Sequence, residues 1–325
     1  MNRRSFLQST AAASASLLPG CASLSSGAPD SLVIDTHQHL WDRTHLNLPW
    51  LSGAPEVLRH DFKDADYVKA NSSVNVKAIY MEVDVDPTDH IKEADWIAAK
   101  CAEGTSPTIA ATIGGRPDSE KFEDYITRYA GNKHVKGLRQ VLHGAGTPKG
   151  HCLSNNFIRG VQALGRHGMN FEITMRPTEL KDGAELIRRC PDTNFVLDHC
   201  GNGDPKAFWP KLAPNEKRGC TADGWKRGID AIAAIPRVMC KISGIVAFVP
   251  PGKWQPEHLA PVVNHCLEAF GPERVFYGGD WPVCLLGGPL SAWFGALKQI
   301  VSSRPEREQR ALWSGNARRF YDLHA

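Results

Sequence analysis

Three histidines and one aspartate stand where a folded chain could assemble hydrolytic chemistry. His37 and His39 form an HxH pair at the end of a β-branched apolar run. Because side chains alternate along a strand, both imidazoles would point the same way. His199 and Asp280 each follow another apolar run. Imidazoles and a carboxylate together can hold a metal ion. Alternatively, the carboxylate can act as a general base while the imidazoles donate hydrogen bonds to a carbonyl oxygen.

Each of these residues also has a structural interpretation. An HxH pair can be two hydrogen-bonded side chains at a strand end, a lone His199 is more often structural, and Asp280 could cap a helix or turn. Gly278 and Gly279 directly precede Asp280, and we interpret them as leaving room for a ligand. The chemical interpretation therefore requires a fold that brings the four side chains together.

Eight short apolar runs predict the strands of that fold. Helical patterns such as 122–129 and 257–270 lie between most of them. No G-x-G-x-x-G follows the first run, which argues against a doubly wound sheet. A parallel barrel closes at eight strands and needs a helix after each, so we predict a single (β/α)8 TIM barrel over residues 31–325. The predicted strands are 32–36, 76–84, 108–113, 135–142, 169–175, 194–199, 237–242 and 274–279.

The connections between these elements are unequal in length. Helix-to-strand connections are short and rich in Gly and Pro, whereas four strand-to-helix connections are long: 40–61, 143–154, 200–224 and 243–256. In a barrel the long ones all emerge at the end that carries active sites. Five tryptophans on this side could form pocket walls or pack the loops against the barrel: Trp41, Trp50, Trp209, Trp254 and Trp281.

The composition is that of an ordinary globular chain. It is 42% hydrophobic and 22% charged, too apolar for a disordered chain. Lys and Arg are interspersed with Asp and Glu, so we expect a small-molecule substrate and no nucleic-acid partner. Beyond Cys21, eight cysteines are spread along the chain without a CxxC pair. We expect them to be small buried hydrophobic residues, with a zinc knot or disulfides as the alternative.

The first 30 residues predict an export signal followed by a linker. Arg3 and Arg4 precede about 15 weakly apolar residues, too few to span a bilayer, which is typical of the twin-arginine pathway. The segment LPGC, ending at Cys21, resembles a lipobox. We therefore expect a periplasmic protein, either anchored as a lipoprotein through Cys21 or released by plain cleavage near the linker. If Arg3 and Arg4 are removed with the export signal, the 38 Lys and Arg residues fall to 36, one more than the 35 Asp and Glu residues.

Taken together, the HxH pair, His199 and Asp280 on a (β/α)8 pattern resemble the amidohydrolase superfamily. The similarity is greatest to its branch of sugar-lactone and pyrone-dicarboxylate lactonases, amidohydrolase family 2. The resemblance implies a hydrolase that opens a cyclic ester, with an aldonolactone as the leading candidate. Asp280 would deprotonate water and return the proton to the leaving alkoxide, while His37, His39 and His199 hold the carbonyl oxygen. The segments that carry this resemblance are IDTHQHLWD, VKGLRQVLH, FVLDHCGN, CKISG and FGPERVFYGGDWPVC.

Further charged residues near the strand ends have open roles. Arg139 and Arg176 could bind substrate hydroxyls or a carboxylate, or form salt bridges that close the barrel. Lys241 could reach the mouth or only cover a strand end. Trp41 and Trp281 are the tryptophans that we assign to substrate binding. Three alternating acids follow the second run, and we expect at least one to cap the next helix: Glu82, Asp84 and Asp86.

A departure from the superfamily pattern bears on the metal. Metal-dependent members use a carboxylated Lys on the fourth strand and a His on the fifth, where this chain has Arg139 and Glu172. We therefore favour a site without a metal or cofactor. A single Zn²⁺ is the alternative, held by His37, His39, His199 and Asp280, with or without Glu172.

Two other functions remain open. One is a mononuclear metal-dependent amidohydrolase or decarboxylase of the same superfamily. The other is a non-catalytic periplasmic barrel that only binds a small molecule. The full set of three histidines and one aspartate argues against the second, because a protein that only binds has no chemical need for it.

Overall fold

The computed structural model describes residues 32–323, which belong to one compact unit, Leu32–Ala325. The expected export signal and linker, with Arg3, Arg4 and Cys21, lie outside the described residues, and both stay predictions. Among the described residues, no helix combines the length and the apolarity that crossing a membrane requires.

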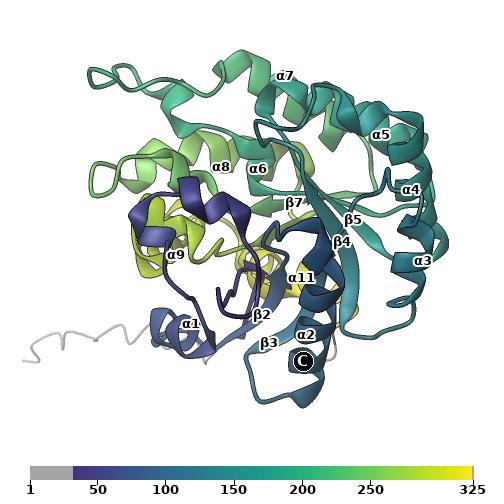
Figure 1. Ribbon diagram of the computed structural model, residues 1–325. Helices are drawn as coiled ribbons and strands as arrows, with labels where there is room; N and C mark the ends of the chain where they lie inside the picture. The colour runs from purple at the N-terminus through teal and green to yellow at the C-terminus, as the bar shows by residue number, and fades with distance from the viewer. Residues whose placement is uncertain (1–31, 324–325) are drawn as a thin grey trace, which may run out of the picture. The chain divides into compact units, whose positions relative to one another are not determined.

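Eight parallel strands form one sheet in which each strand pairs with the next along the chain. Helices cover the outside of this sheet, so the arrangement is a single (β/α)8 barrel (Figure 1). The strands are β1 Val33–Gln38, β2 Val76–Met81, β3 Thr108–Gly114, β4 Val135–Val141, β5 Asn170–Thr174, β6 Phe195–Leu197, β7 Val238–Ile242 and β8 Val275–Tyr277. Each predicted run overlaps one strand, although β1 and β3 extend past their runs, and the predicted fold is confirmed.

The helices follow the apolar periodicity of the sequence. In α8, apolar side chains three and four residues apart are buried, among them Leu259, Val263 and Leu267. The helix ends before Gly271, whose φ of 71° suits glycine. The helices are α1 Asp64–Ala70, α2 His90–Glu103, α3 Phe122–Thr127, α4 Asn155–Arg166, α5 Leu180–Arg189, α6 His199–Asn202, α7 Ala222–Ala233, α8 Pro256–Phe270, α9 Leu290–Val301, α10 Glu306–Arg310 and α11 Asn316–Phe320.

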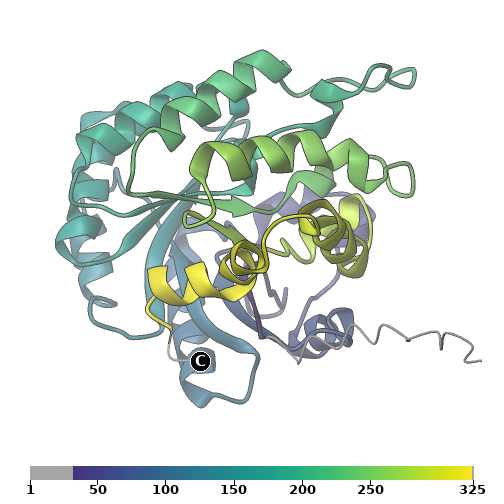
Figure 2. The same ribbon diagram turned by 180° about the vertical axis from the view of Figure 1, so that it is seen from behind.

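The inside of the barrel has an apolar layer at one end and a polar layer next to it, further along the strands. The apolar layer is closed by Ala317 and Tyr321 of the last helical segment, drawn in yellow in Figure 2. Because side chains alternate, the residue two positions further along a strand lies in the next layer. Thr112, Asp198 and Lys241 therefore lie above the apolar layer. That layer consists of Ile34, Ile79, Ala110, Val196, Met239 and Phe276.

Hydrogen bonds between the end of β1 and the residues that follow β8 close the sheet into a barrel. The Asp280 N–H donates to the His37 carbonyl at 2.8 Å, and the His39 N–H donates to the Trp281 carbonyl at 2.8 Å. A Cβ on Gly278 would lie 2.9 Å from the His37 Cβ, and one on Gly279 would overlap the Asp35 carboxylate. These two glycines therefore allow β8 to approach β1, whereas we expected them to leave room for a ligand.

The eight described cysteines are all buried and are free thiols. Their burial agrees with the small hydrophobic role expected of them.

Candidate active site

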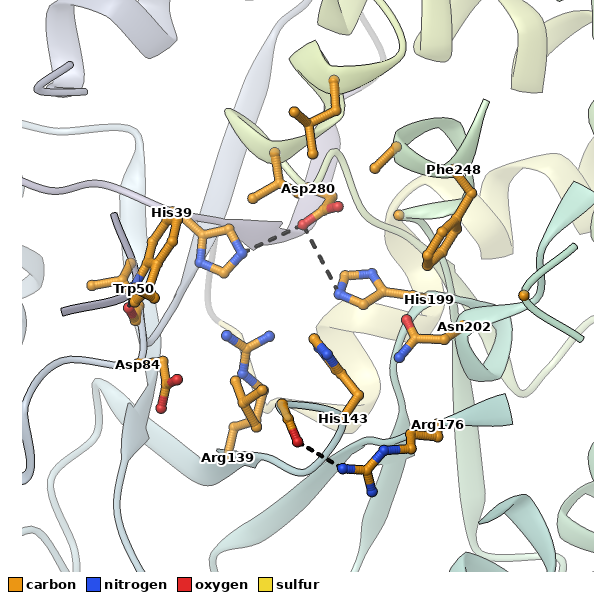
Figure 3. Close-up of a pocket in the computed structure, with 18 of the residues that line it drawn as sticks. His39, Trp50, Asp84, Arg139, His143, Arg176, His199, Asn202, Phe248 and Asp280 are labelled. Carbon is orange, nitrogen blue, oxygen red and sulfur yellow. Dashed lines mark hydrogen bonds and ion pairs between the residues drawn. The ribbon is translucent and has the colours of Figure 1, made fainter. Parts of the chain in front are cut away.

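A cavity of about 510 Å³ opens at the carboxyl ends of the strands. Figure 3 shows polar side chains gathered around it, with His39, His199 and Asp280 facing one another. Many of its residues come from the long strand-to-helix connections, as expected. The lining is formed by His39, Trp41, Trp50, Val83, Asp84, Arg139, Val141, His143, Gly144, Arg176, Pro177, His199, Asn202, Asp204, Gly219, Gly244, Ala247, Phe248, Asp280, Val283 and Leu286.

The fold brings the three histidines to one carboxylate oxygen. Asp280 Oδ1 lies 3.4 Å from His39 Nε2, 3.7 Å from His37 Nε2 and 3.9 Å from His199 Nε2. All four residues are buried, and His37 lies beneath the cavity without lining it. The predicted constellation is therefore assembled at the strand ends.

The second ring nitrogen of each histidine has a neighbour that orients the ring. His199 Nδ1 is hydrogen-bonded to Ser243 Oγ at 3.0 Å. His37 Nδ1 lies 3.5 Å from the Asp198 carboxylate. Ser243 thereby directs the Nε2 of His199 toward Asp280, as outer partners do for histidines that act as ligands. The Nε2 of His37 lies 3.3 Å from Arg139 Nη1 and 3.7 Å from Asp280.

The tautomer of His39 follows from its partner. Its Nδ1 lies 3.0 Å from the Met81 carbonyl oxygen, which can only accept, so Nδ1 carries the proton. A neutral His39 then presents a bare Nε2 lone pair to an Asp280 oxygen 3.4 Å away. Two acceptors that face each other call for a cation or a proton between them. This geometry does not allow a neutral His39 to donate to a carbonyl oxygen, the role that the resemblance implies for it.

Burial favours the neutral form of His37 and of His199. It lowers the pKa of His37 well below its usual value, and the charges of His199 and Lys241 add to the effect. Burial also lowers the pKa of His199, against the opposing effect of Asp280. Neutral imidazole is the form that binds metals.

The donor atoms of His37, His199 and Asp280 lie within 4.8 Å of one another. Two neutral imidazoles and a carboxylate match the ligand set of catalytic zinc sites. The sequence-based preference for a site without metal is therefore not supported, and a divalent metal fits these residues. His39 lies outside this group, although its Nε2 faces the same carboxylate.

A layer of ion pairs lies beneath these residues. The Arg139 Nε donates to Glu82 Oε1 at 2.7 Å. The Lys241 ammonium donates to Glu172 and lies 3.3 Å from Asp198 Oδ1. Removing one member of such a layer leaves its partner charge buried and unpaired. Three buried carboxylates thus accompany two basic side chains in this layer: Glu82, Glu172 and Asp198 with Arg139 and Lys241.

The pKa values of the two carboxyls beside Lys241 are shifted in opposite directions. Burial raises the pKa of Glu172 to about 7, against the lowering effect of Lys241. Burial acts in the same direction on Asp198, but the charges of Lys241 and His37 hold its pKa well below the usual value. Lys241 is fully buried and does not line the cavity. Its ammonium lies within a second possible donor group, His37, Glu172 and Asp198, so Glu172 is not placed with Asp280 as the zinc alternative suggested.

The two arginines assigned to the substrate both line the cavity, but their charges are paired within the protein. Besides Glu82, Arg139 Nη1 lies 3.7 Å from Asp198 Oδ2. Arg176 donates to Glu179 at 2.7 Å and also to the carbonyl oxygens of Gly144 and Thr147. Arg176 thereby fixes the connection after β4, and the salt-bridge alternative applies to both residues.

The tryptophans divide between the cavity wall and the packing of the loops. Trp41 and Trp50 line the cavity, and their indole N–H groups donate to the carbonyls of His60 and Val83. Trp281 is buried against the Phe62 and Tyr67 rings outside the lining. We expected Trp281 to bind substrate, but it supports the loops. Trp209 and Trp254 also lie outside the lining.

Sequence reasoning missed several residues of the site. Glu82, one of the three possible helix caps, instead accepts a hydrogen bond from Arg139. The cap is Asp86, which accepts from the Thr88 N–H in the turn before α2. His143 also lines the cavity, although its side chain is exposed. Its position at the end of VKGLRQVLH was the available signal.

Strained backbone marks the same place. Asp84, His199, Asn202 and Asp280 all line the cavity, and all have φ between 48° and 53°. Residues other than glycine rarely adopt this left-handed conformation, which costs roughly 1–3 kcal/mol each. Such strain gathers at functional sites, where the surrounding structure must hold it.

A (β/α)8 barrel with histidines and an aspartate at its strand ends is the architecture of a barrel hydrolase. The chain belongs to the amidohydrolase family, whose sequence profile matches residues 34–323. The family resemblance is confirmed, and the protein is a hydrolase.

Named relatives cover almost the whole chain. The L-fucono-1,5-lactonase of Burkholderia multivorans is 26% identical over 303 residues, covering 90% of this chain and 97% of the relative. The L-rhamnono-gamma-lactonase of Scheffersomyces stipitis is 24% identical over 343 residues, covering 90% and 98%. A crystal structure of a Burkholderia multivorans amidohydrolase with bound zinc superimposes with a TM-score of 0.77 at 24% identity, covering 90% and 99%. At this identity the structural match bears on the fold alone.

Proposed function

We propose that the protein hydrolyses a cyclic ester, with sugar lactones as the first class to test. The observation that carries the proposal is the position of Asp280, which lines the cavity and whose Oδ1 lies within 3.9 Å of three imidazole nitrogens. The lactonase names of the two relatives support the substrate class.

Asp280 would act first as a general base. It accepts a proton from water as the water oxygen bonds to the carbonyl carbon of the lactone. The carbonyl π electrons move onto oxygen, and the tetrahedral intermediate carries this negative charge. In a site without a metal, His199 would hold that oxygen by donating from Nε2 while Ser243 donates to its Nδ1. As a metal ligand, the same Nε2 carries no proton and cannot donate. The ring C–O bond then breaks, and Asp280 returns the proton to the leaving alkoxide.

We further propose that His37, His199 and Asp280 hold one divalent metal, for which zinc fits the donor set. When bound, the metal would supply Lewis-acid polarisation of the carbonyl group. His39, whose Nε2 faces the same carboxylate, lies outside this donor group.

Purified protein should accordingly hold about one divalent metal per chain, because three ligands with an open position form a catalytic zinc site. Elemental analysis by mass spectrometry measures the content directly. His199→Ala should lose most of the metal, whereas His265→Ala, which changes a histidine of α8 outside the site, should retain it. A content far below one equivalent, with activity that survives chelation, would favour the metal-free site instead.

The function itself is tested by titrating acid release from a panel of sugar lactones, with and without chelator. Turnover of at least one lactone is expected. Failure across γ- and δ-lactones, for protein with its metal present, would overturn the proposal.

Gly244→Ala should lower kcat/KM by about 10², because a misplacement of about 1 Å near the chemistry has this effect. A Cβ at Gly244 would overlap the His199 ring and displace it. Gly252→Ala is the matched control: its φ of 70° is almost the same as the 71° of Gly244, but a Cβ there meets nothing within 4 Å. Equal losses in both variants would assign the effect to backbone strain and not to His199.

A further inference from the structure

One wall of the cavity is apolar throughout. Two short 3-10 turns, η7 (Ile245–Phe248) and η8 (Val283–Leu286), build it. The only side chain in these turns with a hydrogen-bonding group is Cys284, which is fully buried. We call the part that faces the cavity the apolar wall; it consists of Ala247, Phe248, Val283 and Leu286.

Polar groups line the rest of the cavity. In Figure 3, Phe248 lies beside His199 and Asn202, whereas Asp84 and Arg139 lie at the lower left. The apolar wall itself offers a substrate hydroxyl no hydrogen-bonding partner. A hydroxyl held against the apolar wall would lose its water without gaining a hydrogen bond, which is unfavourable.

The apolar wall also leaves hydrophobic surface uncovered. Phe248 is 39% exposed, and it is the only one of the exposed large hydrophobic residues in the range 32–323 that lines the cavity. The wall begins close to the proposed general base, because the Cys284 N–H of η8 donates to the Asp280 carbonyl at 2.8 Å. An apolar group attached directly to the reacting ring would reach it.

We propose that the preferred substrate is a lactone whose ring carries an apolar alkyl or aryl group of several carbons, and that this group packs on the apolar wall. The inference rests on the proposed lactone hydrolysis and narrows its substrate class. It departs from a fully hydroxylated aldonolactone, whose substituents would all require polar partners.

A series of γ-lactones with lengthening alkyl chains on one ring carbon tests the proposal. Each added methylene buried on the wall should raise kcat/KM by about fourfold, until the wall is covered. A polyhydroxylated γ-lactone serves as the comparison. Equal or falling kcat/KM along the alkyl series would overturn the inference, even if the hydroxylated lactone is hydrolysed.

Substitution in the wall tests where the group binds. Phe248→Ala should reduce the preference for the long-chain over the unsubstituted lactone by about tenfold. Ile91→Ala changes a similarly exposed hydrophobic residue, 44% exposed on α2 and outside the cavity, and should leave that preference unchanged. If Phe248→Ala leaves the preference intact, the apolar wall is not the binding surface.

A binding measurement separates this inference from the proposed function. Calorimetry with Asp280→Asn protein compares the affinities of the long-chain and hydroxylated lactones without turnover. Tighter binding of the long-chain lactone supports the apolar wall even if the wild-type protein opens no lactone, a result that would count only against the proposed hydrolysis. Equal or weaker binding overturns the inference.

Discussion

Asp280→Asn should lower kcat/KM for a hydrolysed lactone by roughly 10²–10⁴, the usual contribution of a positioned general base. The amide keeps the size of the side chain but cannot accept the proton of the attacking water. The change also removes one oxygen from the donor group formed with His37 and His199. The measurement is steady-state acid release, together with the metal content of the variant.

The metal content distinguishes two reasons for such a loss. A variant that keeps its metal but loses turnover identifies Asp280 as the base, whereas loss of both identifies it as a ligand. Asp230→Asn is the matched control, because Asp230 is a carboxylate of α7 outside the cavity whose side chain is 58% exposed. Turnover of Asp280→Asn close to that of the wild type would refute the assignment.

Lys241→Met should lower the free energy of unfolding by about 3–5 kcal/mol, the range for breaking a buried ion pair on one side. The side chain is fully buried, and its ammonium lies against Glu172 and Asp198. Methionine fills a similar volume without the charge, so the two carboxyls would lose their shared partner. Denaturation by urea, followed by circular dichroism, gives the difference.

The double variant Lys241→Met/Glu172→Gln should recover part of this loss, because it removes one of the carboxylates that the single change leaves unpaired. Arg188→Met, at an exposed arginine of α5, should leave the midpoint near that of the wild type. A Lys241→Met midpoint equal to the wild type would show that the ammonium does not stabilise this layer.

The sequence predicts the barrel well because strand periodicity and loop asymmetry are local signals. Each predicted run overlaps a strand, and the HxH pair at the end of β1 meets Asp280 after β8 because the sheet closes between them. What could not be predicted depends on neighbours across the barrel. Lys241 could not be assigned to the interior, since Glu172 and Asp198 come from different strands.

The same limit explains the wrong role given to Gly278 and Gly279. Glycine in a sequence indicates that space is needed, but not for what, and here the space is filled by His37 and Asp35. Trp281 likewise follows Asp280 along the chain, yet its ring turns away toward Phe62. Left-handed conformations at Asp84 and Asn202 are set by tertiary contacts and leave no sequence pattern.

The closure of the apolar layer by Ala317 and Tyr321 has a consequence for the order of assembly. Tyr321 donates to Glu172 at 2.8 Å and so helps to build the ionic layer under the catalytic residues. The ribosome makes this segment only after all eight strands. A nascent chain with every strand already formed would still lack this closure and the Tyr321 hydrogen bond, so the layer beneath Asp280 would be completed last.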